Sequence, residues 1–231
     1  MNTLLKVCSC VLVLTIGIAA TSQTTVDTSK PPLRPGVSVV MPKTRNATAI
    51  PGADREDALV VTIMRNGVIF IGTDRVDPSA LPKKLNGRRD FYLKADARTH
   101  YADVLGAIRT ASKGRAETLT LLTSQKDLEM SGPLAPPMGI PVSVVPSISV
   151  TAGTVLLQLL NSIQSGPDLM INNKRLPLTG LKDSLEKHFE NNPRRAVTVE
   201  ASGQLPFADV VNVIDICSSM QATVTLGTRQ F

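Results

Sequence analysis

The chain has 231 residues, of which 42% are hydrophobic and only 3% aromatic, with no Trp. So few aromatic side chains argue against sites that bind by ring stacking. The formal net charge is +6, but the Lys and Arg residues are scattered without a basic stripe, so no nucleic-acid partner is predicted. The excess of cations indicates instead a protein that attracts anionic surfaces. The length suits two small domains of roughly 70–80 residues each.

Residues 1–22 are typical of an export signal. Lys6 is their only charge, and an unbroken apolar run extends from Val7 to Ala20 before the sequence turns polar. This run is shorter than the ~20 residues of a spanning helix. A cleaved signal peptide is therefore predicted, with a short membrane anchor over residues 4–20 as the alternative. Both interpretations predict an exported protein. After cleavage Cys217 would be the one cysteine left, expected to be a small buried side chain.

Residues 23–56 are rich in Pro, which predicts an extended, partly disordered tether. Within it, Val37–Met41 is apolar enough to form an edge strand that ends at Pro42. The first folded unit, residues 57–125, opens with two apolar runs on either side of Asn66-Gly67. Asn-Gly between apolar runs predicts a hairpin with a type I′ turn.

Two helices are predicted in this first unit. The first helix begins at Asp77-Pro78, with Asp as the N-cap and Pro at the first helical position. Pro82 should distort its first turn, and Asn86-Gly87 should end it. The second helix follows an alternating strand at Phe91–Ala95 and precedes a closing strand. Its apolar residues recur at the helical spacing, which marks the buried side: Tyr101, Val104, Leu105 and Ile108.

A second Pro-rich stretch, residues 126–147, predicts a linker. Within it Val142–Val145 echoes the earlier apolar tetrad Val37–Val40, which suggests that the duplication includes the entry strand. The second unit, residues 148–231, repeats the order of the first. Its third and fourth predicted elements are a longer helix at Thr179–Asn191 and a strand that opens at Ala196. A last helix has Pro206 at its first position and Asp209 in its first turn, and it buries Val210, Val211 and Ile214.

The two units match at two offsets. With an offset of 100, Ile71 and Arg75 meet Ile171 and Arg175; with an offset of 105 to 106, Tyr101 meets Phe207. The predicted fold class is therefore α+β: two tandem β-β-α-β-α-β domains. Right-handed crossovers place both helices of each domain on one face of a small mixed sheet.

No catalytic, cofactor or metal site is predicted. His100 and His188 lie in different units, without Cys or acidic neighbours at ligand spacing, and are expected at the surface. Asp103 and Asp209 recur at one helical position, where a first-turn acid stabilises a helix N-terminus. On one strand face, the first unit has Lys94 and Asp96 where the second has Glu200 and Ser202, so the two units share no site chemistry there. Phosphate-binding and nucleophile motifs are absent from the sequence, and no enzyme is predicted.

The order of these motifs resembles the ExbD/TolR family of biopolymer-transport proteins. The matching features are Val37–Pro42, the Asn66-Gly67 turn, Leu93–Asp96, Tyr101–Val104 and Leu119–Thr123. The second unit matches through Val197–Ala201, Phe207–Val210 and Val224–Thr228.

The resemblance implies an envelope protein that works with a channel subunit of the ExbB/TolQ type and a TonB- or TolA-like partner. It also implies a periplasmic location after export across the inner membrane, with an inner-membrane anchor over residues 4–20 as the alternative. The expected function is an accessory or structural component of a transport system linked to the proton-motive force. The alternative is a periplasmic module that holds peptidoglycan or an envelope protein without proton coupling. A homodimer is expected. Members that couple to proton flow carry an aspartate in the membrane helix, but residues 1–22 hold no acid.

Overall fold

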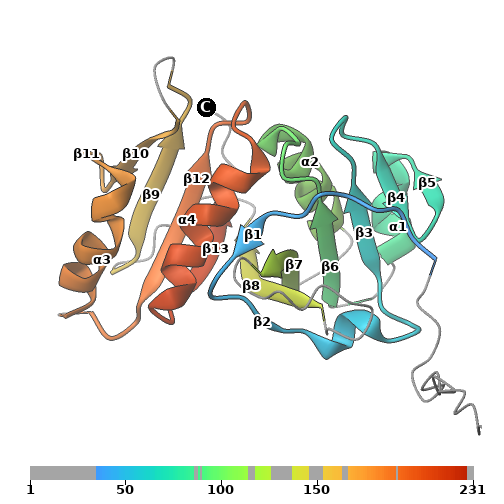
Figure 1. The fold of residues 1–231 in the computed structure, drawn as a ribbon, viewed down its shortest axis with the longest axis horizontal. Coiled ribbons are helices and arrows are strands. Elements are labelled where there is room, and N and C mark those ends of the chain that lie inside the picture. Colours follow the sequence, from blue (N-terminus) through green and yellow to red (C-terminus); the bar gives the residue numbers. More distant parts are fainter. Residues whose placement is uncertain are drawn as a thin grey trace, which may run out of the picture. The chain divides into compact units, whose positions relative to one another are not determined.

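In the part of the chain that the structure describes, thirteen strands form one mixed sheet, to which the first and the second half of the chain both contribute (Figure 1). The structure is a computed structural model, and it describes residues 35–85, 88, 90–113, 118–125, 137–145, 153–162, 166–190 and 192–227. The predicted export signal and the predicted helix end at Asn86-Gly87 lie outside these residues. The strand order is β11-β10-β9-β12-β13-β8-β7-β6-β3-β4-β5, with β1 beside β7 and β2 beside β8.

The first half supplies the right-hand strands of Figure 1 and two helices. Parallel pairs join β3 to β6 and β6 to β7, and antiparallel pairs join β3 to β4 and β4 to β5. Its elements are β3 (Val60–Ile63), β4 (Ile69–Ile71), β5 (Asp74–Val76), α1 (Leu81–Leu85), β6 (Asp90–Ala95), α2 (Tyr101–Ser112) and β7 (Thr118–Gln125).

The second half has the same order of elements and the same pattern of parallel and antiparallel pairs. Its elements are β9 (Val155–Leu160), β10 (Asp168–Ile171), β11 (Lys174–Leu176), α3 (Leu181–Glu190), β12 (Ala196–Ala201), α4 (Phe207–Ser219) and β13 (Thr223–Gly227).

The strand registers of the halves agree with the offsets seen in the sequence. Val61 pairs with both Ile71 and Leu93, and Leu157 pairs in the same way with Ile171 and Val199. Ile71 and Ile171 are separated by 100 residues, and Leu93 and Val199 by 106.

Each half contains one strand more than the predicted β-β-α-β-α-β order. The extra strands, β5 and β11, are three residues long and mostly charged, so they carry too little apolar pattern to be recognised. The type I′ turn predicted at Asn66-Gly67 is also wrong: the hairpin is present, but only Gly67 of the pair has positive φ. A two-residue turn with positive φ at both positions lies instead between β10 and β11, at Asn172 and Asn173.

The predicted linker 126–147 contains a central strand, β8 (Met138–Val145). β8 pairs antiparallel with β7 and parallel with β13, and so makes one large sheet where two small ones were predicted. Its composition hides it, because Pro141 usually argues against a central strand. Pro141 lies opposite Thr120 of β7. On the other side of β8 it falls between the stretch that pairs with β2 and the stretch that pairs with β13.

Of the predicted tether, residues 35–56 are described, and they contain two short strands and a 3-10 helix where an extended, partly disordered segment was predicted. Residues 35–42 are not a strand, so the edge strand expected at Val37–Met41 is wrong. They run into β1 (Lys43–Thr44), β2 (Thr48–Ala49) and a 3-10 helix at Pro51–Asp54. Thr44, Ala47 and Ala53 are buried in this segment. We call residues 35–50 the arm.

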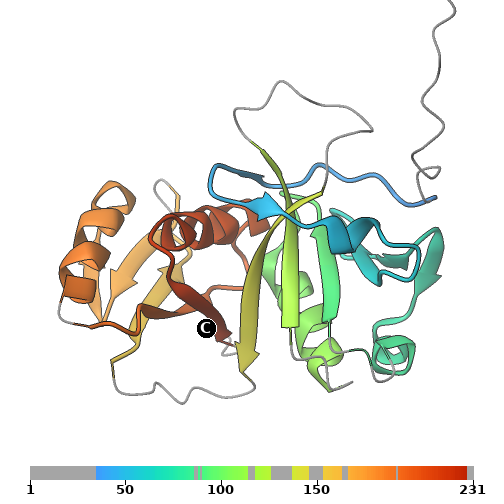
Figure 2. The ribbon, with the colours of Figure 1, turned by 90° about the horizontal axis from the view of Figure 1, so that it is seen from below.

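The helices of the two halves lie on opposite sides of the strands between them (Figure 2). α1 packs on α2, and α3 packs on α4. The first predicted helix begins as a 3-10 turn at Pro78–Ala80, with the Asp77 side chain accepting from Ser79 N, and α1 follows it. The six apolar positions predicted for the later helices are all fully buried, which confirms their buried faces: Val104, Leu105, Ile108, Val210, Val211 and Ile214.

Candidate functional site at the seam between the halves

The two halves meet through reciprocal backbone hydrogen bonds at the starts of α2 and α4. Tyr101 N donates to Leu205 O, and Phe207 N donates to Thr99 O, each at 2.8 Å. A second pair, Ala102 N to Gly203 O and Ala208 N to Ala97 O, measures 2.9 Å in both directions. Each donor and each acceptor of the first half corresponds to one in the second half that lies 106 residues later in the chain. We call Ala97–Ala102 and Gly203–Ala208 the seam.

The seam supplies hydrogen-bond acceptors for backbone N–H groups at the starts of α2 and α4. The first N–H groups of a helix have no partner within the helix, and at the seam each helix donates them to the loop before the other helix. Both halves present the same surface to each other, which is the geometry of an isologous contact between identical subunits. Here this contact lies within one chain.

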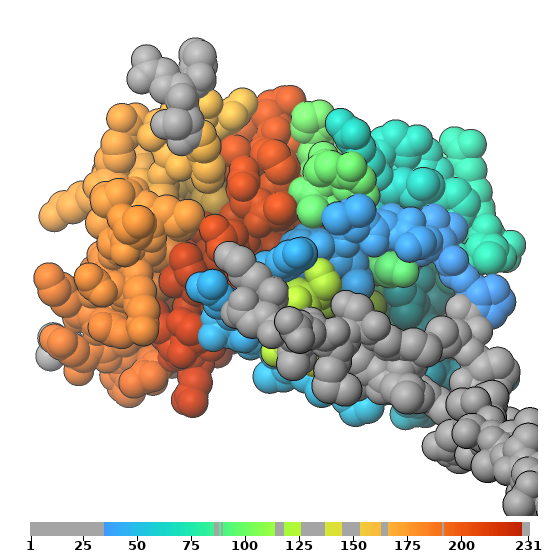
Figure 3. All heavy atoms as spheres, viewed as in Figure 1, coloured from blue at the N-terminus to red at the C-terminus, as the bar shows by residue number. Residues whose placement is uncertain are grey.

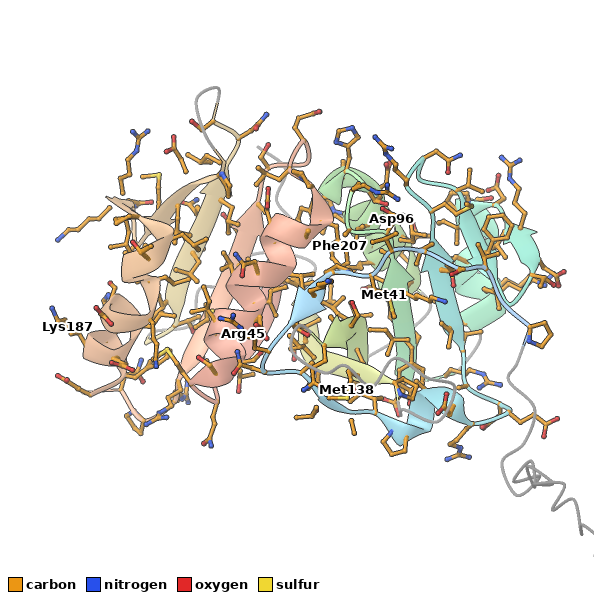
Figure 4. All side chains as sticks on the ribbon, viewed as in Figure 1. Met41, Arg45, Asp96, Met138, Lys187 and Phe207 are labelled. Atoms are coloured by element: carbon orange, nitrogen blue, oxygen red, sulfur yellow. The ribbon has the colours of Figure 1, made fainter. Side chains whose placement is uncertain are left out.

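Two aromatic residues at equivalent positions complete the seam. Tyr101 and Phe207 are both almost completely buried, and Figure 4 shows Phe207 at the start of α4. Burial raises the pKa of Tyr101, and its hydroxyl has no hydrogen-bond partner among the described residues. His100 is exposed, as predicted, but its Nδ1 lies 3.2 Å from Gln204 O across the seam.

Asp96 joins the end of β6 to the arm. The carboxylate accepts from Arg98 Nε and Nη2, each at 2.9 Å, and from Val40 N at 3.3 Å. Ala97 N donates back to Val40 O. These hydrogen bonds, chiefly those from the Arg98 side chain, lower the pKa of Asp96 to about 2. Asp96 therefore holds the arm as an ion at neutral pH.

The neighbouring polar positions differ in chemistry between the halves, as the sequence predicted. Lys94 donates from Nζ to Val37 O at 3.0 Å, and partial burial lowers its pKa. Its counterpart Glu200 is fully buried; one oxygen accepts from Gln158 Nε2 at 3.1 Å, and the other has no partner among the described residues. We call the contact of the Asp96 carboxylate with the arm the Asp96 latch. Ser202, the counterpart of Asp96, has no carboxylate and cannot form such a contact.

A second carboxylate, Asp215 of α4, holds the arm from the other half. It accepts from Arg45 N at 3.0 Å and from Asn46 N at 2.8 Å, and Asn46 Nδ2 donates to Asp215 O at 3.2 Å. The sequence analysis missed this residue. The signal that could have identified Asp215 is its charge beside the apolar Ile214 in an otherwise apolar helix. The equivalent position in the first half, 106 residues earlier, is Arg109, so the carboxylate is not repeated.

A groove of about 350 Å³ opens beside this contact. Its walls are residues 43–46 of the arm, the start of α3 and the last two turns of α4. Figure 3 shows the left end of the arm, in blue, beside the red surface of the second half.

The remaining candidate residues form no reactive cluster. His188 is exposed on α3, and Asp103 and Asp209 lie in the first turns of α2 and α4. Burial raises the pKa of Asp209. Burial also raises the pKa of Cys217 to about 12, which leaves it an inert thiol. Among the described residues no group of His, Cys, Asp and Glu could hold a metal ion.

These features define the class of the protein: an α+β module whose polar residues hold segments and halves together. Residues 130–230 match the family model described as "Biopolymer transport protein ExbD/TolR". This match confirms the resemblance over residues 130–230. Searches of curated proteins and of solved structures returned no match. None of the helices in the described ranges is both long and apolar enough to cross a membrane.

Proposed function

We propose that this protein is an ExbD/TolR-like component of the cell envelope that serves a biopolymer transport system as an accessory or structural subunit. The family match over residues 130–230 carries the proposal. The recurring registers support a tandem arrangement, with residues 57–125 as a second ExbD-like domain beside residues 148–231. In this arrangement one chain supplies both partners of the seam.

The partners that fit this function are a channel subunit of the ExbB/TolQ type and a TonB- or TolA-like protein. The chain would work in the periplasm after export, directed there by residues 1–22. A homodimer of the whole chain would use a surface other than the seam, because the seam is already paired within one chain.

Deletion of the gene followed by measurement of energy-dependent uptake tests the proposal. We expect uptake to fall and to return with the wild-type gene, and we expect the channel subunit to co-purify with the tagged chain. Unchanged uptake together with no channel subunit in the purified material would refute the transport role.

Proton coupling is a separate point within this proposal. The apolar stretch Val7–Ala20 has no acid to relay protons. The chain alone should therefore fail to replace an ExbD subunit in a strain that lacks one. Restored uptake at normal expression would contradict this expectation.

The net charge of +6 favours a second candidate function, a module that holds peptidoglycan, because a cationic protein is attracted to an anionic wall polymer. Co-sedimentation with purified sacculi tests this function. Binding that persists at physiological salt would support it, and recovery of all the protein in the supernatant would exclude it.

A further inference from the structure

We propose that residues 37–41 of the arm form a contact between two copies of this chain, in which the two runs pair antiparallel across a two-fold axis. The proposal names a surface for the homodimer of the proposed function and rests on that part of it alone. The transport role does not depend on this contact. The seam is not available for it, because the seam is paired within one chain.

An exposed apolar side chain marks this surface. Among the residues that the structure describes, Val40 is the only large apolar side chain that is exposed, at 59%. A single exposed valine is ordinary on a protein surface, but Val40 lies in a run that is apolar apart from Ser38. Val37, Val39 and Met41 are half-buried beside it. Figure 3 shows the arm, in blue, at the surface of the first half.

The backbone of this run is fixed at one residue and open at its neighbours. Val40 N donates to the Asp96 carboxylate at 3.3 Å, and Ala97 N donates to Val40 O at 2.7 Å. The backbone groups of Ser38 and Val39, in contrast, form no hydrogen bond with any residue that the structure describes. A backbone segment that is held in place and keeps open N–H and C=O groups is a template on which another chain can pair.

The charge of the run favours a second copy as the occupant. Residues 35–42 contain no charged residue, although the whole chain has a formal net charge of +6. Beneath the run, Lys94 donates to Val37 O and Arg98 pairs with Asp96, so the cations there bind acceptors of their own chain. Two cationic copies can therefore pair at this run without like charges directly opposite each other. Because the runs are identical, one isologous contact satisfies both copies equally.

The size of the run limits the strength of this contact. Two runs of five residues bury much less than the roughly 1,200–2,000 Å² of a stable interface. We therefore expect a weak dimer, with a dissociation constant on the order of 0.1–1 mM.

Sedimentation equilibrium of the purified full chain, at concentrations about tenfold on either side of that dissociation constant, tests for the dimer. A dilution series of the ¹⁵N-labelled chain, followed by NMR, locates the contact. We expect a reversible monomer–dimer equilibrium, with concentration-dependent amide shifts centred on residues 37–41.

Substitutions at Val40 test the run itself. Val40→Lys should raise the dissociation constant about tenfold, because the change enters the contact twice and places two like charges near each other. Val40→Ile, which keeps the apolar surface, should leave the dimer intact. The matched control is Asn212→Lys, which adds the same charge at an exposed position of α4 and should not change the dissociation constant.

Three results would overturn the proposal: a monomer at every concentration, shifts centred outside residues 37–41, or an equal loss of dimer in Asn212→Lys. A thermal melt of each variant excludes unfolding as the cause of a loss. Each of these results would leave the transport role standing, since uptake and co-purification of the channel subunit test that role separately.

Discussion

The ends of β6 and β12 occupy equivalent positions in the two halves but carry different polar side chains. In the first half Asp96 and Lys94 both bind the arm, the first as an ion at neutral pH and the second through a backbone carbonyl. In the second half Ser202 and Glu200 occupy these positions, and Glu200 keeps one oxygen unpaired among the described residues. The apolar positions of the same strands remain equivalent, with Leu93 and Val199 both fully buried.

The contrast shows which part of the repeat is constrained by packing. Inward-facing residues must fill the same space between sheet and helices, so their size and register are preserved. Residues on the other side of the strand depend on what covers them. The arm covers that side in the first half, and there the polar residues are suited to holding it.

The largest expected effect tests whether the buried apolar residues of α2 and α4 pack equivalently in the two halves. Ile108→Ala and Ile214→Ala should each lower the free energy of unfolding by roughly 2–5 kcal/mol, because both side chains are fully buried at matching positions. Chemical denaturation monitored by circular dichroism measures both losses. A loss below about 0.5 kcal/mol at one position only would show that the helices do not pack equivalently.

A larger side chain at Gly203 tests the contact between the two halves at the seam. A Cβ at Gly203 would lie 2.9 Å from Ala102 Cβ, so Gly203→Ala should destabilise the protein by about 1–3 kcal/mol. The control is Gly106→Ala on α2, where nothing lies within 4 Å of the added atom and where helix propensity predicts a gain of about 1 kcal/mol. Thermal unfolding of the two variants should shift in opposite directions, and equal shifts would contradict the close contact.

The Asp96 latch should make stability depend on pH. Asp96→Asn should cost about 1–2 kcal/mol near neutral pH. The folded-state pKa of about 2 lies below the ordinary value of 3.8. The contribution of the carboxylate is therefore complete above about pH 4 and is lost as the pH falls toward 2.

Urea denaturation across this range should show the wild type and the variant converging at low pH. Ser202→Ala, at the equivalent position without a carboxylate, should change stability by the same amount at each pH. A difference for Asp96→Asn that does not vary with pH would exclude the latch.

The smallest effect concerns the aromatic pair at the seam. The Tyr101 hydroxyl is buried, it has no hydrogen-bond partner among the described residues, and its counterpart is Phe207. Tyr101→Phe should therefore raise stability by up to about 1 kcal/mol. Phe207→Tyr should lower it by about the same amount. Differential scanning calorimetry resolves changes of this size, and a loss of stability in Tyr101→Phe would indicate a partner for the hydroxyl.

The sequence predicted the elements that depend on local pattern. The stripes of α2 and α4, the hairpin around Gly67 and the Asp77 cap follow from spacing and turn chemistry within a few residues. Of β8, the sequence indicated a strand only at Val142–Val145, which the structure contains. The length of β8 and its central place were missed, because they depend on pairing with strands from both halves and no local signal outweighs Pro141. The contacts of Asp215 were missed for the same reason, since the arm residues that meet it are about 170 residues away in the chain.

The seam has a consequence for assembly, because it lies within a single polypeptide. Two separate subunits would hold such a contact only above a certain concentration, whereas covalent linkage keeps the partners at a high effective concentration however dilute the protein becomes. Linkage also frees each partner from carrying the same residue at each position, as identical subunits must. Asp215 and Arg109 show this freedom: a change that builds a groove in one half needs no matching change in the other.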